Sequence, residues 1–85
     1  MKILKFNTKW CSPCKAMTPS YQLLKEEFNQ HEYLDVDCEE NLDLVTQYEI
    51  LGVPFFVVLD KEVEVLRTNN LDKLKELLQA ETDWL

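Results

Sequence analysis

The sequence has very little of several residues: one glycine, three prolines, three cysteines and one histidine in 85 residues. So little glycine and proline excludes collagen-like and linker-like chains. Three cysteines are too few, and an odd number, for a disulfide-stapled secreted scaffold. The longest apolar run, residues 53–59, is far shorter than the roughly 20 residues of a membrane span.

The N-terminus also lacks the roughly 7–15 apolar residues of a secretory signal, because its few apolar residues stand between lysines. We therefore expect a cytoplasmic protein that does not enter membranes.

Apolar residues make up 46% of the chain and charged residues 29%, which is typical of a globular protein. The length excludes two independent folding units, so we expect a single domain over residues 1–85. The net charge of −7 argues against nucleic-acid binding, which needs a basic surface. Residues 1–25, however, hold five lysines and no acid, so the N-terminal end is basic.

The first half of the chain predicts a strand, a helix and a second strand. Residues 2–7 form a short apolar strand that ends in a turn. An amphipathic helix from Ser12 to about Asn29 is expected to bend at Pro19. Its apolar positions are Met17, Tyr21, Leu24 and Phe28. Residues 33–37 alternate apolar and acidic side chains and predict a strand parallel to the first, because a helical crossover joins them.

The second half predicts a helix, two strands and a last helix. A short helix over residues 40–49 should turn Leu42, Val45 and Tyr48 inward. The apolar run 55–59 predicts a strand covered on both faces, residues 60–62 a turn, and residues 63–66 an edge strand. Asn69 or Asn70 should cap the last helix. The apolar stripe of this helix is Leu71, Leu74, Leu77 and Leu78. The predicted order is β-α-β-α-β-β-α, an α/β fold.

The segment Trp10-Cys11-Ser12-Pro13-Cys14-Lys15 places a Cys-X-X-Cys pair where the first strand meets the first helix. Two intervening residues put both sulfurs within disulfide reach across the first helical turn. The unpaired N–H groups of that turn stabilise a thiolate on Cys11. Lys9 and Lys15 add positive potential and should lower the pKa of Cys11 further. Cys14 should be more buried and less ionised.

This arrangement suits thiol–disulfide exchange. The Cys11 thiolate attacks a substrate disulfide, and Cys14 then resolves the mixed disulfide, so the redox pair itself serves in place of a cofactor. The alternative is half of a zinc site, for which only Cys38 and His31 could complete the ligand set, at a spacing that matches no zinc ribbon. We favour the redox interpretation and expect no metal. A redox-inert interaction module stays open as a further class.

These residues resemble the thioredoxin family over nearly the whole chain. The segment from Trp10 to Lys15 is similar to the family's W-C-G-P-C-K with serine for glycine, and Pro19 matches its helix-kinking proline. Gly52-Val53-Pro54 is similar to its signature turn. The resemblance implies a thioredoxin-like fold, with a four-stranded mixed sheet flanked by helices, in a minimal version without the family's extra first strand and helix. It also implies a cis Pro54 against the cysteine pair, and a Val53 backbone free to pair with an extended substrate.

The chain departs from the family at Lys5, which stands where thioredoxins carry a buried aspartate that assists proton transfer. Lys5 could snorkel to the surface, accept the proton of Cys14, or be a solvated strand lysine. We expect Cys38 to be a buried structural residue, His31 to be solvated, and Trp84 to pin the C-terminal end to the core.

The resemblance implies a protein disulfide reductase. An apolar ring would receive the client strand, with Lys9 and Lys15 attracting acidic partners. The ring comprises Trp10, Ile50, Val53 and Pro54. The implied partners are disulfide-containing proteins, ribonucleotide reductase being one candidate, and a flavoprotein thioredoxin reductase as electron donor. We expect a monomer. A glutaredoxin-like, glutathione-dependent reductase is the alternative, disfavoured because Asn69-Asn70 stands where glutaredoxins have a glycine pair.

Overall fold

The computed structural model of the protein describes residues 1–83, with side chains through residue 81, and Trp84 lies outside the described part. The strands within this part form one mixed sheet in the order β2-β1-β3-β4. They are β1 (Lys2–Asn7), β2 (Glu32–Asp37), β3 (Phe55–Asp60) and β4 (Val63–Thr68). β1 is parallel to β2 and antiparallel to β3, which is antiparallel to β4. The predicted mixed sheet, with β4 at an edge, is confirmed.

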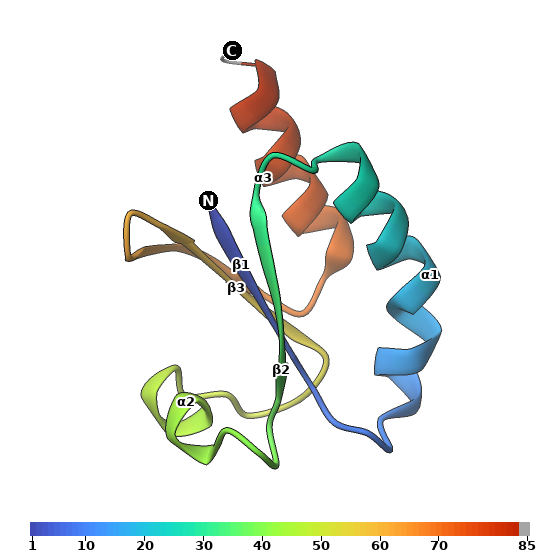
Figure 1. Ribbon diagram of the computed structural model, residues 1–85, viewed down its shortest axis with the longest axis vertical. Coiled ribbons are helices and arrows are strands. Elements are labelled where there is room, and N and C mark those ends of the chain that lie inside the picture. The colour runs from blue at the N-terminus through green and yellow to red at the C-terminus, as the bar shows by residue number, and fades with distance from the viewer. Residues whose placement is uncertain (84–85) are drawn as a thin grey trace.

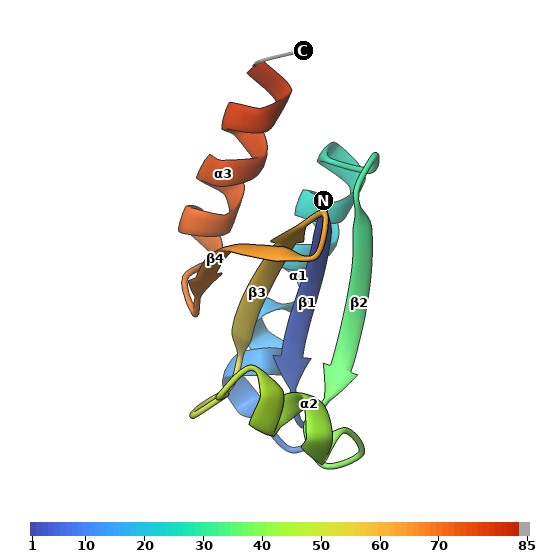
Figure 2. The ribbon, with the colours of Figure 1, turned by 90° about the vertical axis from the view of Figure 1, so that its left-hand side faces the viewer.

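Helices cover both faces of the sheet. They are α1 (Ser12–Glu27), α2 (Leu42–Gln47) and α3 (Leu71–Asp83). Figure 1 shows α1 and α3 side by side, with α2 apart from them at one end of the strands. In the turned view of Figure 2, α2 lies in front of that end, and α1 lies behind the strands. The predicted order of elements is confirmed.

Each face of the sheet packs into its own apolar cluster, because successive strand residues point to opposite faces. Ile3 joins the cluster under α1 and α3, whereas Leu4 and Phe6 join the cluster under α2. Residues 56–58 of β3 have no exposed surface, so the strand is covered on both faces as predicted. Pro19 lies inside α1, as the sequence indicated, and the bend expected at this residue stays a prediction.

α2 is shorter than predicted, and one of its expected core residues is exposed. Leu42 leaves 68% of its surface exposed, while Leu44, Val45 and Tyr48 pack against the sheet. Residues two apart on a helix differ by about 200° in direction, so a helix that buries Leu44 turns Leu42 to the outside. The prediction for Leu42 was wrong for this reason.

α3 begins as predicted, and the structure selects Asn70 as its cap. The Asn70 side-chain oxygen accepts the backbone N–H of Asp72 at 2.8 Å. The apolar stripe of α3 packs on the sheet, with Leu74 and Leu78 fully buried. None of the helices within residues 1–83 combines the length and the apolar character that crossing a bilayer requires.

Strand pairing fixes where the two parts of the site lie. Phe6, near the end of β1, pairs with Phe55 at the start of β3. The chain that leaves β1 therefore lies at the same end of the sheet as Pro54, which immediately precedes β3. This end of the two central strands carries the cysteine pair and the loop of residues 48–54, which contains Pro54 and is called the proline loop below.

Candidate active site

Cys11 and Cys14 form a disulfide at the N-terminus of α1, with their Cα atoms 5.2 Å apart. Cys11 is 6% exposed and Cys14 3% exposed. The backbone N–H of Cys14 donates a hydrogen bond to Cys11 Sγ at 3.1 Å. The first turn of α1 contains no acidic residue. The expected reach between the two sulfurs is therefore confirmed, and the helix end faces the sulfur of Cys11.

The local sequence explains this geometry. Cys11 has the extended backbone of an N-cap residue, with φ −83° and ψ 107°. Its Sγ takes the place of the serine or aspartate oxygen that usually accepts the third N–H of a helix. Pro13 fits the first turn, where its missing N–H would have no helical partner. Ser12, Pro13 and Lys15 are exposed around the pair.

The second part of the site is the loop that joins α2 to β3. The Val53–Pro54 peptide bond is cis, as the family resemblance implied. Ile50 is 9% exposed and packs in the cluster under α2, so it supports the loop from beneath. Leu51 is fully exposed. It lines two neighbouring hollows, one of about 770 Å³ that reaches Arg67 and one of about 360 Å³ that reaches Pro54.

Leu51 is the residue that the sequence analysis missed at this loop. The available signal was an apolar residue immediately before the single glycine. Arg67 holds the start of this loop, because its guanidinium donates to the backbone carbonyl oxygens of Tyr48 and Glu49. The guanidinium carbon also lies 5.5 Å from the ring centroid of Phe55.

Lys9 and Trp10 form the rim of the site beside Cys11, and both contact the loop that follows β2. Trp10 is 71% exposed, and its indole N–H donates to Glu39 Oε1 at 2.7 Å. Lys9 pairs with Glu40 at 3.4 Å. That ion pair is exposed and stabilises the fold weakly, but it partly offsets the positive potential expected of Lys9. The glutamates lie 29 and 31 residues from their partners, and no local sequence pattern pointed to them.

Lys5 is 6% exposed, so the interpretation as a solvated strand lysine is wrong. The physical reason is its place in a central strand, on the face that α1 covers. Its Nζ lies 5.3 Å from the ring centroid of Tyr21. The Tyr21 hydroxyl is buried with no hydrogen-bond partner among the described residues. Burial, and then the charge of Asp35 on β2, raise the pKa of Tyr21. The role of Lys5 as a proton acceptor stays a prediction.

Cys38 and His31 lie in two separate environments. Cys38 is a half-buried free thiol against the cluster under α2, and burial, followed by the charge of Asp37, raises its pKa. His31 Nδ1 lies 3.0 Å from the Met1 amine, and its Nε2 is buried without a hydrogen-bond partner in the described structure. The expectation that His31 is solvated was therefore wrong. Residues 1–83 contain no group of three or more potential metal ligands.

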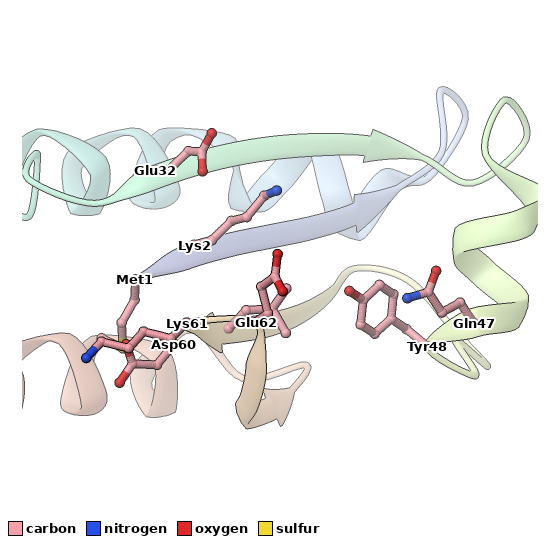
Figure 3. Close-up of a pocket in the computed structure, with 9 residues that line it drawn as sticks. Met1, Lys2, Glu32, Gln47, Tyr48, Asp60, Lys61 and Glu62 are labelled. Carbon is pink, nitrogen blue, oxygen red and sulfur yellow. The ribbon is translucent and has the colours of Figure 1, made fainter.

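Another hollow, of about 740 Å³, lies on the face of the sheet that carries α2 (Figure 3). Side chains from the start of β1, the end of α2 and the β3–β4 turn line it, including Lys2, Tyr48 and Glu62. It contains none of the predicted site residues. Its lining mixes lysines and carboxylates, in contrast to the apolar surface at Leu51.

A mixed sheet that carries a Cys-X-X-Cys disulfide at a helix N-terminus and a cis-proline before the neighbouring strand defines a thioredoxin-like protein. The comparisons with known proteins agree. The family model Thioredoxin matches residues 1–82. The chain belongs to the thioredoxin family.

Among curated proteins, the chain is 40% identical to the chloroplastic F-type thioredoxin of Spinacia oleracea, over 92% of this chain and 43% of the relative. Thioredoxin H5 of Oryza sativa is 32% identical over 87% of this chain and 56% of the relative. The chain spans about half the length of these curated relatives. Thioredoxin 1 of Thermosipho africanus superposes with a TM-score of 0.85 at 29% identity, covering 98% of this chain and 96% of that protein.

Proposed function

We propose that this protein is a thiol–disulfide oxidoreductase that acts as a protein disulfide reductase. The observation that carries the proposal is the Cys11–Cys14 disulfide at the N-terminus of α1, with a helical N–H directed at Cys11 Sγ. In the reduced protein this N–H and the helix dipole stabilise a Cys11 thiolate. The same features make Cys11 the nucleophile and Cys14, one turn into the helix, the resolving thiol.

The reaction has two exchange steps. Cys11 thiolate attacks one sulfur of the client disulfide, which forms a mixed disulfide and releases the other client sulfur as a thiolate. Cys14, after losing its proton, attacks Cys11 Sγ and releases the second client thiolate. The client gains two electrons, and the pair is oxidised to the Cys11–Cys14 disulfide. A separate donor then returns two electrons to the pair.

The client binds across the rim and the proline loop. Trp10 and Leu51 present exposed apolar side chains, and Val53 and Pro54 line the hollow beside Leu51. An extended client segment can pair with the backbone at Val53 as an added strand does. Ile50 contributes from beneath by holding the loop, since its own side chain is nine-tenths buried.

The physiological partners are part of the proposal. Disulfide-containing proteins are the clients, with ribonucleotide reductase as one candidate, and a flavoprotein thioredoxin reductase is the proposed donor. The cytoplasmic location and the monomeric state stay predictions, and chloroplastic thioredoxins are among the relatives. Turnover with glutathione alone, and none with a thioredoxin reductase, would favour the glutaredoxin-like alternative.

The test is to trap the mixed disulfide with Cys14→Ser. This variant keeps the nucleophile and removes the resolving thiol, so covalent client adducts should accumulate through Cys11 and dissociate with dithiothreitol. Cys11→Ser is the matched control and should trap nothing. A Cys38→Ser background removes the remaining free thiol. Adducts that disappear in the Cys38→Ser background, with none left on Cys11, would show that the nucleophile assignment is wrong. Failure of the wild-type protein to reduce insulin would overturn the proposed function itself.

A further inference from the structure

Trp10 is an exposed side chain that is nevertheless held in place. With 71% of its surface open to solvent, its indole has little packing to fix its orientation. The hydrogen bond to Glu39 supplies that fixation, because a 2.7 Å contact between an N–H and a carboxylate is short and charge-assisted. The exposed rings beside the nucleophile are therefore oriented by a residue from another loop.

The turn that carries Glu39 is itself well anchored. The Glu39 N–H donates to Asp37 Oδ1 at 2.9 Å, and the Asn41 side-chain amide donates to the Asp37 carbonyl oxygen at 2.9 Å. The Cys38 N–H donates to the Asn7 carbonyl oxygen at 2.9 Å, which joins the start of this turn to the end of β1. The backbone from which the Glu39 side chain reaches the indole is thus fixed in place.

We propose that Glu39 is a positioning residue that holds the Trp10 indole ready for protein clients, and so sets affinity for protein disulfides without changing the chemistry at the sulfurs. The inference rests on the proposed function. A protein client meets the apolar surface of the indole, because Glu39 already takes the N–H. Without the bond to Glu39, the Trp10 side chain would lose rotamer freedom when a client bound, which would weaken binding. With the bond, this freedom is already lost in the unbound protein.

This proposal predicts a client class as well as a residue role. Clients that cover Trp10 place apolar side chains or backbone against the rings, and gain no hydrogen bond from the indole. Small disulfides, which reach the cysteine pair without covering Trp10, should be indifferent to Glu39. Comparing protein disulfides with small-molecule disulfides therefore distinguishes an effect on client binding at Trp10 from an effect on the chemistry at the cysteines.

The experiment compares Glu39→Ala with Glu39→Gln and Glu40→Ala. Prereduced protein is mixed with excess insulin in single-turnover stopped flow, which gives a half-saturation concentration and a limiting rate. Glu39→Ala should raise the half-saturation concentration roughly three- to tenfold and leave the limiting rate within about twofold. Its rate with 5,5′-dithiobis(2-nitrobenzoate) should also stay within about twofold of wild type, because this disulfide need not cover Trp10.

The two other variants are controls. Glu39→Gln keeps a side-chain acceptor for the indole and should restore wild-type values. Glu40→Ala removes the same charge from the same turn without touching Trp10. It frees Lys9 from its ion pair, so it should not raise the half-saturation concentration. Equal effects of Glu39→Ala and Glu40→Ala would overturn the proposal in favour of simple electrostatics, and so would failure of Glu39→Gln to restore binding.

A spectroscopic measurement tests the physical link. In a Trp84→Phe background Trp10 is the remaining tryptophan, and Glu39→Ala should lower its steady-state fluorescence anisotropy. Glu39→Ala should also have no further effect on insulin binding once Trp10 is changed to Phe. Additive effects, or unchanged anisotropy, would refute the positioning role. An inactive wild-type protein would instead count against the proposed function, which keeps the two failures distinct.

Discussion

Leu51→Ala should weaken client binding without weakening the fold. Leu51 is fully exposed in the free protein, so the substitution should change the free energy of unfolding by less than about 0.5 kcal/mol. It removes three carbon atoms, at about 0.8 kcal/mol each if a client buries them, which amounts to roughly 2 kcal/mol. Partial coverage in a complex reduces this to about 1–2 kcal/mol, a roughly 5- to 30-fold rise in the half-saturation concentration for insulin.

The matched control is Leu23→Ala. Leu23 is a leucine of α1 with 67% of its surface exposed, and it lines a hollow between α1 and α3, remote in sequence from the proline loop. Urea denaturation measures stability, and single-turnover insulin reduction measures binding. Equal half-saturation concentrations for the two variants would refute the role of Leu51. So would a loss of stability above 1 kcal/mol on Leu51→Ala, since a fully exposed side chain has no packing to lose.

Three further predictions address buried groups. Lys5→Met keeps the apolar stem and removes a buried amino group, so the free energy of unfolding in urea should rise by about 1 kcal/mol; a fall would mean that the contact between the Lys5 amino group and the Tyr21 ring stabilises the fold by more than its burial costs. Release of client from the mixed disulfide should also slow in this variant if Lys5 accepts the Cys14 proton. Iodoacetamide at pH 7 should modify Cys11 before Cys38 in the reduced protein, because the raised pKa keeps Cys38 protonated; peptide mass spectrometry that found the reverse order would contradict this. Burial lowers the pKa of His31, so the unfolded chain binds its proton more readily and stability should decline as the pH falls below about 6.5; His31→Gln should show a shallower decline.

The sequence predicted the elements whose signal is local and strong. The apolar run of β3 and the spacing of Tyr21, Leu24 and Phe28 on α1 follow directly from periods of two and 3.6 residues. The cysteine pair could be recognised for a similar reason, because its chemistry depends on the two residues that separate the cysteines and on their place at a helix N-terminus. The cis bond at Pro54 came from the family resemblance, because sequence physics alone does not distinguish it from an ordinary loop proline.

The features that were missed depend on position within the fold. Lys5 carries a charge that predicts exposure, but its place between two other strands and under α1 decides its burial. The direction of Leu42 depends on which turn of α2 meets the sheet. The bond between Trp10 and Glu39 joins segments 29 residues apart and exists only because β1 and β2 end side by side.

The capping role of Cys11 links the redox state of the protein to the start of α1. When the Cys11 thiol of the reduced protein ionises, the helix begins with an anionic sulfur, whereas in the disulfide and in the mixed disulfide that sulfur is neutral. The helix therefore stabilises the reduced state selectively. This makes the pair a weaker electron donor than a dithiol of the same spacing that does not lie at a helix N-terminus. An acidic residue in the first turn, where none now stands, would remove part of this preference and turn the same fold into a stronger reductant.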